Sequence, residues 1–283
     1  MNRAAIDQAC PMPAAGGPQR HAPRIAALLL PAFLAALLLR GQGETTALLI
    51  ASSLLMFGAS AASAVHLLGA RAALRFMLIA VAAGWAGEQL GSSYGLLFGA
   101  YTYTDVLGPR LGDVPVVIPL MWFALTYGAY VMANLAVWQA PVDGAAGLGW
   151  SAALSLLAAL IVTAWDLGAD PYFVFTLKAW IMHKQDGWWF GETLQGFVGW
   201  MTVSFFIVLG FRLTHRFGPI RPMLPAARRH VLVPLALYGG CMVFQMAVGD
   251  PVELRTVAFF ALGIPLLVAA CGLARWQSTH HQE

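Results

Sequence analysis

Residues 75–97 read RFMLIAVAAGWAGEQLGSSYGLL, an apolar run of membrane-spanning length that contains a single carboxylate, Glu88. About 20 apolar residues in a helix are enough to cross the hydrocarbon core of a bilayer. An ionised carboxylate at that depth is costly, so a carboxylate kept there is a functional candidate by default. The alternative role for Glu88 is structural, as a hydrogen-bonding partner of a neighbouring helix.

The composition of the whole chain agrees with a membrane location. Hydrophobic residues make up 59% of the 283 positions and charged residues only 10%, with a mean hydropathy of +0.71. Soluble domains carry roughly a quarter charged residues, so the chain is predicted to be an integral membrane protein. No basic run alternates with aromatics, which argues against a nucleic-acid partner. The three cysteines form no CxxC or His/Cys cluster, which gives no case for a zinc site or disulfide framework.

Eight apolar runs follow one another along the chain. Their approximate bounds are 25–39, 45–68, 72–97, 114–138, 148–167, 197–213, 231–248 and 257–274. They predict an all-α, polytopic integral membrane helix bundle with about eight transmembrane helices, forming one domain over residues 25–275. The polar, proline-rich residues 1–24 are predicted to be a disordered N-terminal tail and residues 276–283 a C-terminal tail. The aromatic segment 168–196 suits an interfacial or re-entrant stretch.

The basic residues indicate how such a bundle lies in the membrane. With eight alternating spans, one side carries 11 of the Lys and Arg residues and the other side carries 5. Because cytoplasmic loops are enriched in Lys and Arg, both termini are expected in the cytoplasm, with the protein in a bacterial cytoplasmic (inner) membrane. Ten of the thirteen acidic residues fall on the opposite side or in the half of a helix that faces it. The chemistry is therefore expected near the outer pole.

A second group of carboxylates, Asp166 and Asp170, closes the run LIVTAWDLGADP at residues 160–171. A helix rise of 1.5 Å per residue places Asp166 about 25 Å and Glu88 about 20 Å along their helices, in the same outer layer. The i, i+4 spacing puts both aspartates on one helix face, where two buried like charges favour a single shared proton. A cap or turn before Pro171 is the alternative use of these aspartates.

Glycines and aromatic residues accompany the acids. Four glycines at 87, 91, 95 and 99 form a smooth strip for close approach of a helix or of a thin rigid ligand. Tryptophans flank the acids, and their ring faces stabilise cations, although aromatic belts at the membrane interface also use tryptophan. We predict Glu88, Asp166 and Asp170 as acid–base groups. The predicted substrate-binding residues are Trp85, Gly91, Gly95, Tyr101, Tyr103, Trp122, Trp165, Trp180 and Trp200.

Four motifs in the central part of the chain, roughly residues 85–200, carry a family resemblance. They are Glu88-x-x-Gly91-x-x-x-Gly95-x-x-Phe98-Gly99-x-Tyr101-x-Tyr103, Val114-Pro115 with Trp122, Asp166-x-x-x-Asp170-Pro171 followed by Trp180, and Gly187-x-x-Phe190-Gly191 ending in Phe197-x-Gly199-Trp200. The chain resembles the membrane-bound carotenoid biosynthesis hydratases, which include carotenoid 1,2-hydratases, γ-carotene 1'-hydroxylases and bisanhydrobacterioruberin hydratases. It departs from them at Gly191-Glu192-Thr193, where relatives tend to have Gly-Val-Pro, and at Gly196, where they tend to have Asn. Glu192 adds a carboxylate at this point.

The resemblance implies a hydro-lyase that adds water across a terminal C=C bond of an acyclic carotenoid dissolved in the bilayer. Protonation of such an alkene gives a tertiary cation, which requires an acid in an apolar site, aromatic faces near the cation and a base for the attacking water. The reaction needs no cofactor and no metal. Other enzymes of the carotenoid pathway are further candidate partners.

Two other readings remain open at the level of the sequence. In a Mg²⁺-dependent prenyl or lipid-diphosphate enzyme, Asp166 and Asp170 would hold the metal, although such sites gather more carboxylates than this one pair. In a proton-coupled transporter or a non-catalytic scaffold, Glu88 would be a relay. The lack of an internal repeat argues against transport.

Overall fold

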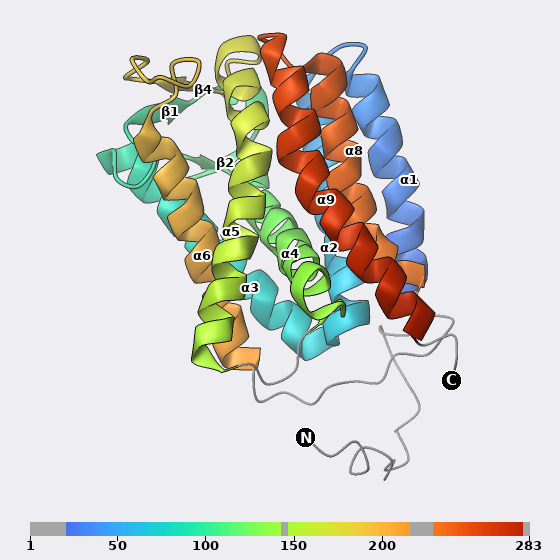
Figure 1. The fold of residues 1–283 in the computed structure, drawn as a ribbon. Helices are drawn as coiled ribbons and strands as arrows, with labels where there is room; N and C mark the ends of the chain where they lie inside the picture. The colour runs from blue at the N-terminus through green and yellow to red at the C-terminus, as the bar shows by residue number, and fades with distance from the viewer. Residues whose placement is uncertain (1–20, 143–146, 216–228, 280–283) are drawn as a thin grey trace.

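The computed structural model describes residues 21–142, 147–215 and 229–279. Within these ranges, eight long helices stand side by side in one bundle (Figure 1). They are α1 (Ala22–Arg40), α2 (Thr46–Leu68), α3 (Ala70–Tyr94), α4 (Val117–Trp138), α5 (Leu148–Pro171), α6 (Leu194–His215), α8 (Leu232–Val248) and α9 (Glu253–Thr279). By length and composition, seven of them could cross a membrane, and α8 is a shorter apolar helix. The predicted all-α integral membrane bundle of about eight helices is confirmed.

The helix ends differ from the predicted runs in several places. The predicted tail at residues 1–24 lies mostly outside the described residues, but α1 already begins at Ala22, with Pro23 in its first turn, where proline is tolerated. At the other end α9 continues to Thr279, so the first four residues of the predicted C-terminal tail are helical. Residues 114–115 form a short strand before α4 begins. Helix α3 ends at Tyr94 because Gly95 takes a left-handed conformation.

Helix α4 is the centre of the bundle. In its most apolar window 78% of the residues are buried inside the protein, against 28–44% for the other spans. Helices α2, α3, α5 and α9 all pack against α4, and the outward faces of the surrounding helices expose large apolar side chains such as Leu78, Phe206 and Leu267. A central helix enclosed by helices with apolar outer faces is expected when the solvent is lipid.

Short strands cover one end of the bundle, the upper end in Figure 1. Strand β1 (Tyr101–Tyr103) pairs antiparallel with β4 (Trp180–Met182), and β2 (Arg110–Leu111) pairs with β3 (Val114–Pro115). The aromatic segment 168–196 begins in the last turn of α5 and continues as a π-helical turn (Tyr172–Thr176) and then as β4. The segment therefore stays at this end of the bundle. Helix α1 begins and α9 ends at the opposite end (Figure 1).

Candidate functional site

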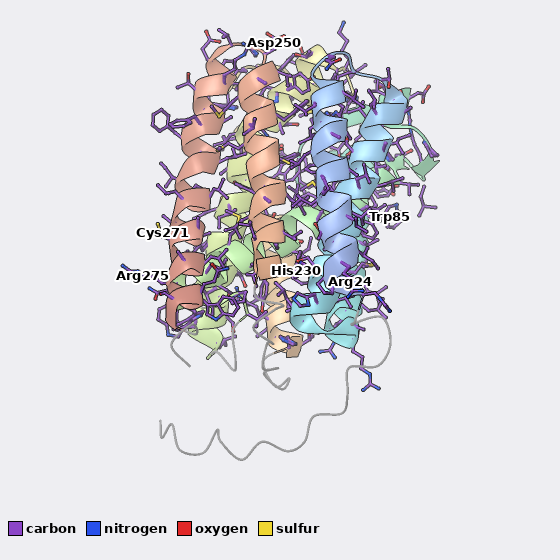
Figure 2. All side chains as sticks on the ribbon, turned by 90° about the vertical axis from the view of Figure 1, so that its right-hand side faces the viewer. Arg24, Trp85, His230, Asp250, Cys271 and Arg275 are labelled. Carbon is purple, nitrogen blue, oxygen red and sulfur yellow. The ribbon has the colours of Figure 1, made fainter. Side chains whose placement is uncertain are left out.

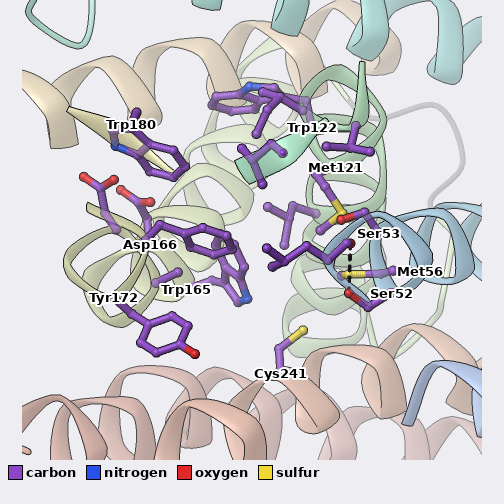
Figure 3. A pocket seen from close by; sticks show the side chains of 18 of the residues that line it. Ser52, Ser53, Met56, Met121, Trp122, Trp165, Asp166, Tyr172, Trp180 and Cys241 are labelled. Atoms are coloured by element: carbon purple, nitrogen blue, oxygen red, sulfur yellow. Dashed lines mark hydrogen bonds between the residues drawn. The ribbon is translucent and has the colours of Figure 1, made fainter. Parts of the chain in front are cut away.

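A pocket lies among the helices at the strand-covered end of the bundle, and residues of β1 and β4 are part of its lining. The pocket has an empty volume of about 1210 Å³, which includes space open to the surroundings. Every long helix except α9 contributes to its lining. Figure 3 shows Trp165, Asp166, Tyr172 and Trp180 on one side of the pocket and Ser52, Ser53, Met56 and Met121 on the opposite side. The lining is mainly apolar and aromatic, as expected for a site that takes an apolar ligand.

Glu88 faces this pocket from α3 and is 5% exposed. Its Oε2 accepts hydrogen bonds from the hydroxyl groups of Tyr101 and Tyr103, the latter at 2.7 Å. Its Oε1 accepts from Trp122 Nε1 at 2.9 Å. Three donors from two other elements therefore fix both oxygens of this carboxyl group.

Strand β1 brings the two tyrosines to Glu88. Residues two apart on a strand point to the same face, so Tyr101 and Tyr103 approach Glu88 together, and pairing with Met182 and Trp180 of β4 holds the strand in place. Gly91 provides the room, because a Cβ there would lie 3.0 Å from the Tyr101 ring and hydroxyl. Burial, followed by the nearby Glu88 carboxylate, raises the pKa of Tyr101 and of Tyr103 well above the usual range. Both hydroxyls therefore remain protonated donors.

Helix α5 supplies the other predicted acids. Asp166 is 1% exposed and Asp170 is 7% exposed, and both line the same pocket as Glu88. Asp166 Oδ2 has no hydrogen-bond partner among the described residues. The structure thus brings together all three predicted acid–base residues, as the estimate of their depth indicated.

A series of aromatic rings lines the pocket together with the acids. Trp122 and Trp200 stack with ring centroids 4.4 Å apart, and Trp165 lies 6.2 Å from Trp200. The ring of Tyr103, whose hydroxyl donates to Glu88, packs edge-on against Trp180 at 5.8 Å. All five of these aromatic residues line the pocket.

Three predicted substrate-binding residues lie outside the lining. Trp85 donates to the Leu111 carbonyl at 3.0 Å and lies at the outside of the bundle (Figure 2). Gly91 packs beneath Phe98 and Tyr101, and Gly95 ends α3 in a left-handed conformation. These three residues are therefore not part of the pocket lining, and their predicted contact with a ligand stays a prediction.

Sequence reasoning missed a polar group at the α1–α2 end of the pocket. Arg40, 8% exposed, donates to the Glu44 carboxylate at 2.8 Å and to Ser52 Oγ at 3.2 Å, and its guanidinium lies over the Phe244 ring. Tyr172 donates to the same Glu44 carboxylate at 3.1 Å. The i, i+4 spacing of Arg40 and Glu44 at the end of the first apolar run was the available signal.

The acids do not form a metal-ligand cluster in the part of the chain that the structure describes. No three His, Cys, Asp or Glu side chains there converge so as to hold a metal ion. Arg40, the cationic residue lining the pocket, already has Glu44 as a partner. A diphosphate–Mg²⁺ site combines several carboxylates with free cationic groups, and among the described residues the lining includes no cationic group without an acidic partner.

The sequence profile described as "Carotenoid biosynthesis protein" matches residues 45–269, which include the whole pocket apart from its α1 residues. The chain belongs to the carotenoid biosynthesis protein family. A curated relative in this comparison is the bisanhydrobacterioruberin hydratase of Haloarcula japonica, which is 31% identical over 125 residues. That match covers 44% of this chain and 39% of the relative's length. No solved structure matches this member of the carotenoid biosynthesis protein family.

Proposed function

We propose that this protein is a cofactor-independent hydro-lyase that adds water across a terminal C=C bond of an acyclic carotenoid. The observation that carries the proposal is the convergence of Glu88, Asp166 and Asp170 on one aromatic, mainly apolar pocket. Membership of the carotenoid biosynthesis family and the name of the hydratase relative support the substrate class and the reaction class.

The chemistry matches what the pocket offers. Protonation of the alkene at its less substituted carbon leaves a tertiary cation at the other carbon, and a water molecule then bonds to that cation and releases a proton to a carboxylate. Water near the cation must be limited and well placed, which favours an enclosed apolar site. The stacked Trp122 and Trp200 rings present π faces, which attract cations.

Two buried polar atoms on α5 have no hydrogen-bond partner among the described residues, and one of them, Asp166 Oδ2, is the candidate acceptor for the attacking water. Asp166 Oδ2 is a buried acceptor without a partner, and Trp165 Nε1 is a buried donor that faces the Cys241 sulfur without reaching hydrogen-bond geometry. Both residues line the pocket. A buried water needs two or more polar partners, and Asp166 Oδ2 would supply one acceptor among them.

Expression in a host that makes lycopene tests the proposal. Extracted pigments should include a product heavier by one water, absent when the host carries an empty vector. Unchanged lycopene beside a well-accumulated protein would contradict hydration of this substrate class, and a product gaining oxygen without the two hydrogens would indicate an oxygenase.

We also propose that the acids lie in the periplasmic half of a bacterial inner membrane, with both termini cytoplasmic. The bias of 11 against 5 basic residues supports this orientation. Reporter fusions at each end should give the cytoplasmic signal, and a periplasmic signal at either end would reverse the assignment.

A further inference from the structure

Hydrogen-bond donors are distributed unequally among the buried carboxyl groups of the site. Glu88 receives donors from Tyr101, Tyr103 and Trp122. Asp166 Oδ2 and both carboxyl oxygens of Glu192 receive none from the described residues. A carboxyl group that accepts several hydrogen bonds is stabilised as a carboxylate, whereas one without donors must carry or share a proton to avoid an unpaired buried charge.

Glu192 belongs to this donor-poor group, although it lies outside the pocket lining. Its backbone pairs with Trp189, to whose carbonyl it donates at 2.8 Å, and its exposed fraction is 1%. Gly187 allows the fold, since a Cβ there would collide with the Glu192 carbonyl oxygen. This loop holds the Glu192 carboxyl within hydrogen-bonding range of the Asp170 carboxyl.

Two carboxylates accept but cannot donate, so this contact becomes a hydrogen bond only when one of the pair carries a proton. The ion pairs found in the described residues, Arg40–Glu44 and Arg110–Asp105, do not include Asp170 or Glu192. The charged groups that act on the pair are Asp166 and Glu88, both acidic, and Tyr101 lies within electrostatic range of Asp170. Burial raises the pKa of Glu192, so the pair keeps a proton at pH values where an exposed glutamate has lost it.

We propose that Glu192 is a positioning residue that shares a proton with Asp170, so that the α5 side of the pocket is the acid and Glu88 is the carboxylate. The division of roles in catalysis rests on the proposed hydration, whereas the shared proton does not. In the reaction, Asp170, the member of the pair that lines the pocket, donates the shared proton to the alkene carbon. Water then bonds to the cation, and Glu88 accepts the proton that water releases. That proton then returns from Glu88 to the Asp170–Glu192 pair, past the Tyr101 hydroxyl. The starting state of the protein is thereby restored, and the net reaction is the addition of one water to the alkene.

Infrared spectroscopy of the purified protein tests the shared proton without any substrate. At neutral pH the carbonyl band of a protonated carboxylic acid should be present in the wild type and in Glu88→Gln. It should be weakened in Glu192→Gln, because the glutamine amide can donate to Asp170 and removes the need for the proton. Asp170→Asn should weaken the same band and serves as a second reporter if Glu192→Gln fails to fold. A band lost in Glu88→Gln but kept in both other variants would overturn the assignment.

The pH profile of product formation in membranes separates positioning from a structural role. In Glu192→Gln the fall in activity at high pH should move to lower pH by about one unit or more, because Asp170 holds its proton less tightly. Asp186→Asn, an exposed acid on the same loop, should keep the wild-type profile. A loss of activity that is equal at all pH values, with no shift of the pH profile, would contradict the inference. A normal infrared pattern with no hydrated product would contradict the proposed function while leaving the shared proton intact.

Discussion

The two ends of the bundle both bury polar and aromatic side chains, but they use them differently. At the end where α1 begins, Phe76 stacks on Phe211 at 4.2 Å, the Ser63 and Tyr127 hydroxyls pair at 2.8 Å, and Arg212 donates to Asn134 at 2.7 Å. At the strand-covered end, aromatic rings surround a pocket, and three buried carboxyl oxygens near it, Asp166 Oδ2 and both oxygens of Glu192, have no donors among the described residues. Unpaired buried polar groups lower stability. Their concentration beside a pocket therefore indicates that this end is organised for chemistry and the other for packing.

Glu88→Gln should produce the largest effect on activity. The amide keeps the side-chain volume but can neither accept a proton nor carry the charge held by Tyr101, Tyr103 and Trp122. Loss of an acid–base group costs about 100- to 10,000-fold, and we expect about 1,000-fold here with normal protein accumulation. Pigment analysis alongside an immunoblot measures both. Wild-type product levels in this variant would remove Glu88 from the mechanism.

The aspartates of α5 should come next, with unequal effects. Asp166→Asn is expected to reduce product formation about 300-fold and Asp170→Asn about 100-fold, both within the range for an acid–base group. The reason is that Asp166 lies deeper along the apolar run and has an unpaired oxygen, whereas Asp170 is at the helix end. Rates of product formation per amount of protein give the ranking, and the opposite order would place the water site nearer Asp170.

Phe76→Ala tests the packing end of the bundle. Removing a buried aromatic ring costs about 3–5 kcal/mol in stability, so the melting temperature in detergent should fall clearly. Activity per folded molecule should stay close to wild type because Phe76 does not line the pocket. Phe206→Ala, on an exposed face of α6, is the matched control and should change neither quantity much. Loss of turnover in well-folded Phe76→Ala would show that the two ends are coupled.

A chelator should have the smallest effect. Membranes treated with EDTA are expected to keep full activity, because the proposed reaction transfers only protons and water. Restoration of a lost activity by Mg²⁺ would instead support a diphosphate enzyme, and zinc-dependent recovery would point to a metal-activated water.

The sequence was sufficient to predict the fold and the shared depth of the three acids, and the reason is physical. Spans and depth follow from apolar length and helix rise, so Glu88, Asp166 and Asp170 could be placed in one layer. Which face of a helix lines a pocket depends on tertiary packing, which the local sequence does not determine. Trp85 is only one turn from Glu88, but it donates a hydrogen bond to the Leu111 carbonyl and does not line the pocket.

Two other features could not be obtained from periodicity. Glu192 reaches Asp170 because the loop after β4 folds back through the paired residues Gly187 and Gly191. The Arg40–Glu44 ion pair reaches the pocket because α1 and α2 pack beside α8. Both depend on long-range contacts rather than on local pattern, although each residue type was visible in the sequence.

Isotope labelling of the product oxygen tests the central claim most directly. Membranes containing the protein and an acyclic carotenoid are incubated in ¹⁸O-labelled water under unlabelled air, and in a parallel sample in ordinary water under labelled O₂. Hydration predicts that the hydroxylated product carries the label from water and none from O₂, and that it forms without NAD(P)H. Label arriving from O₂, or a requirement for a reductant, would contradict the account.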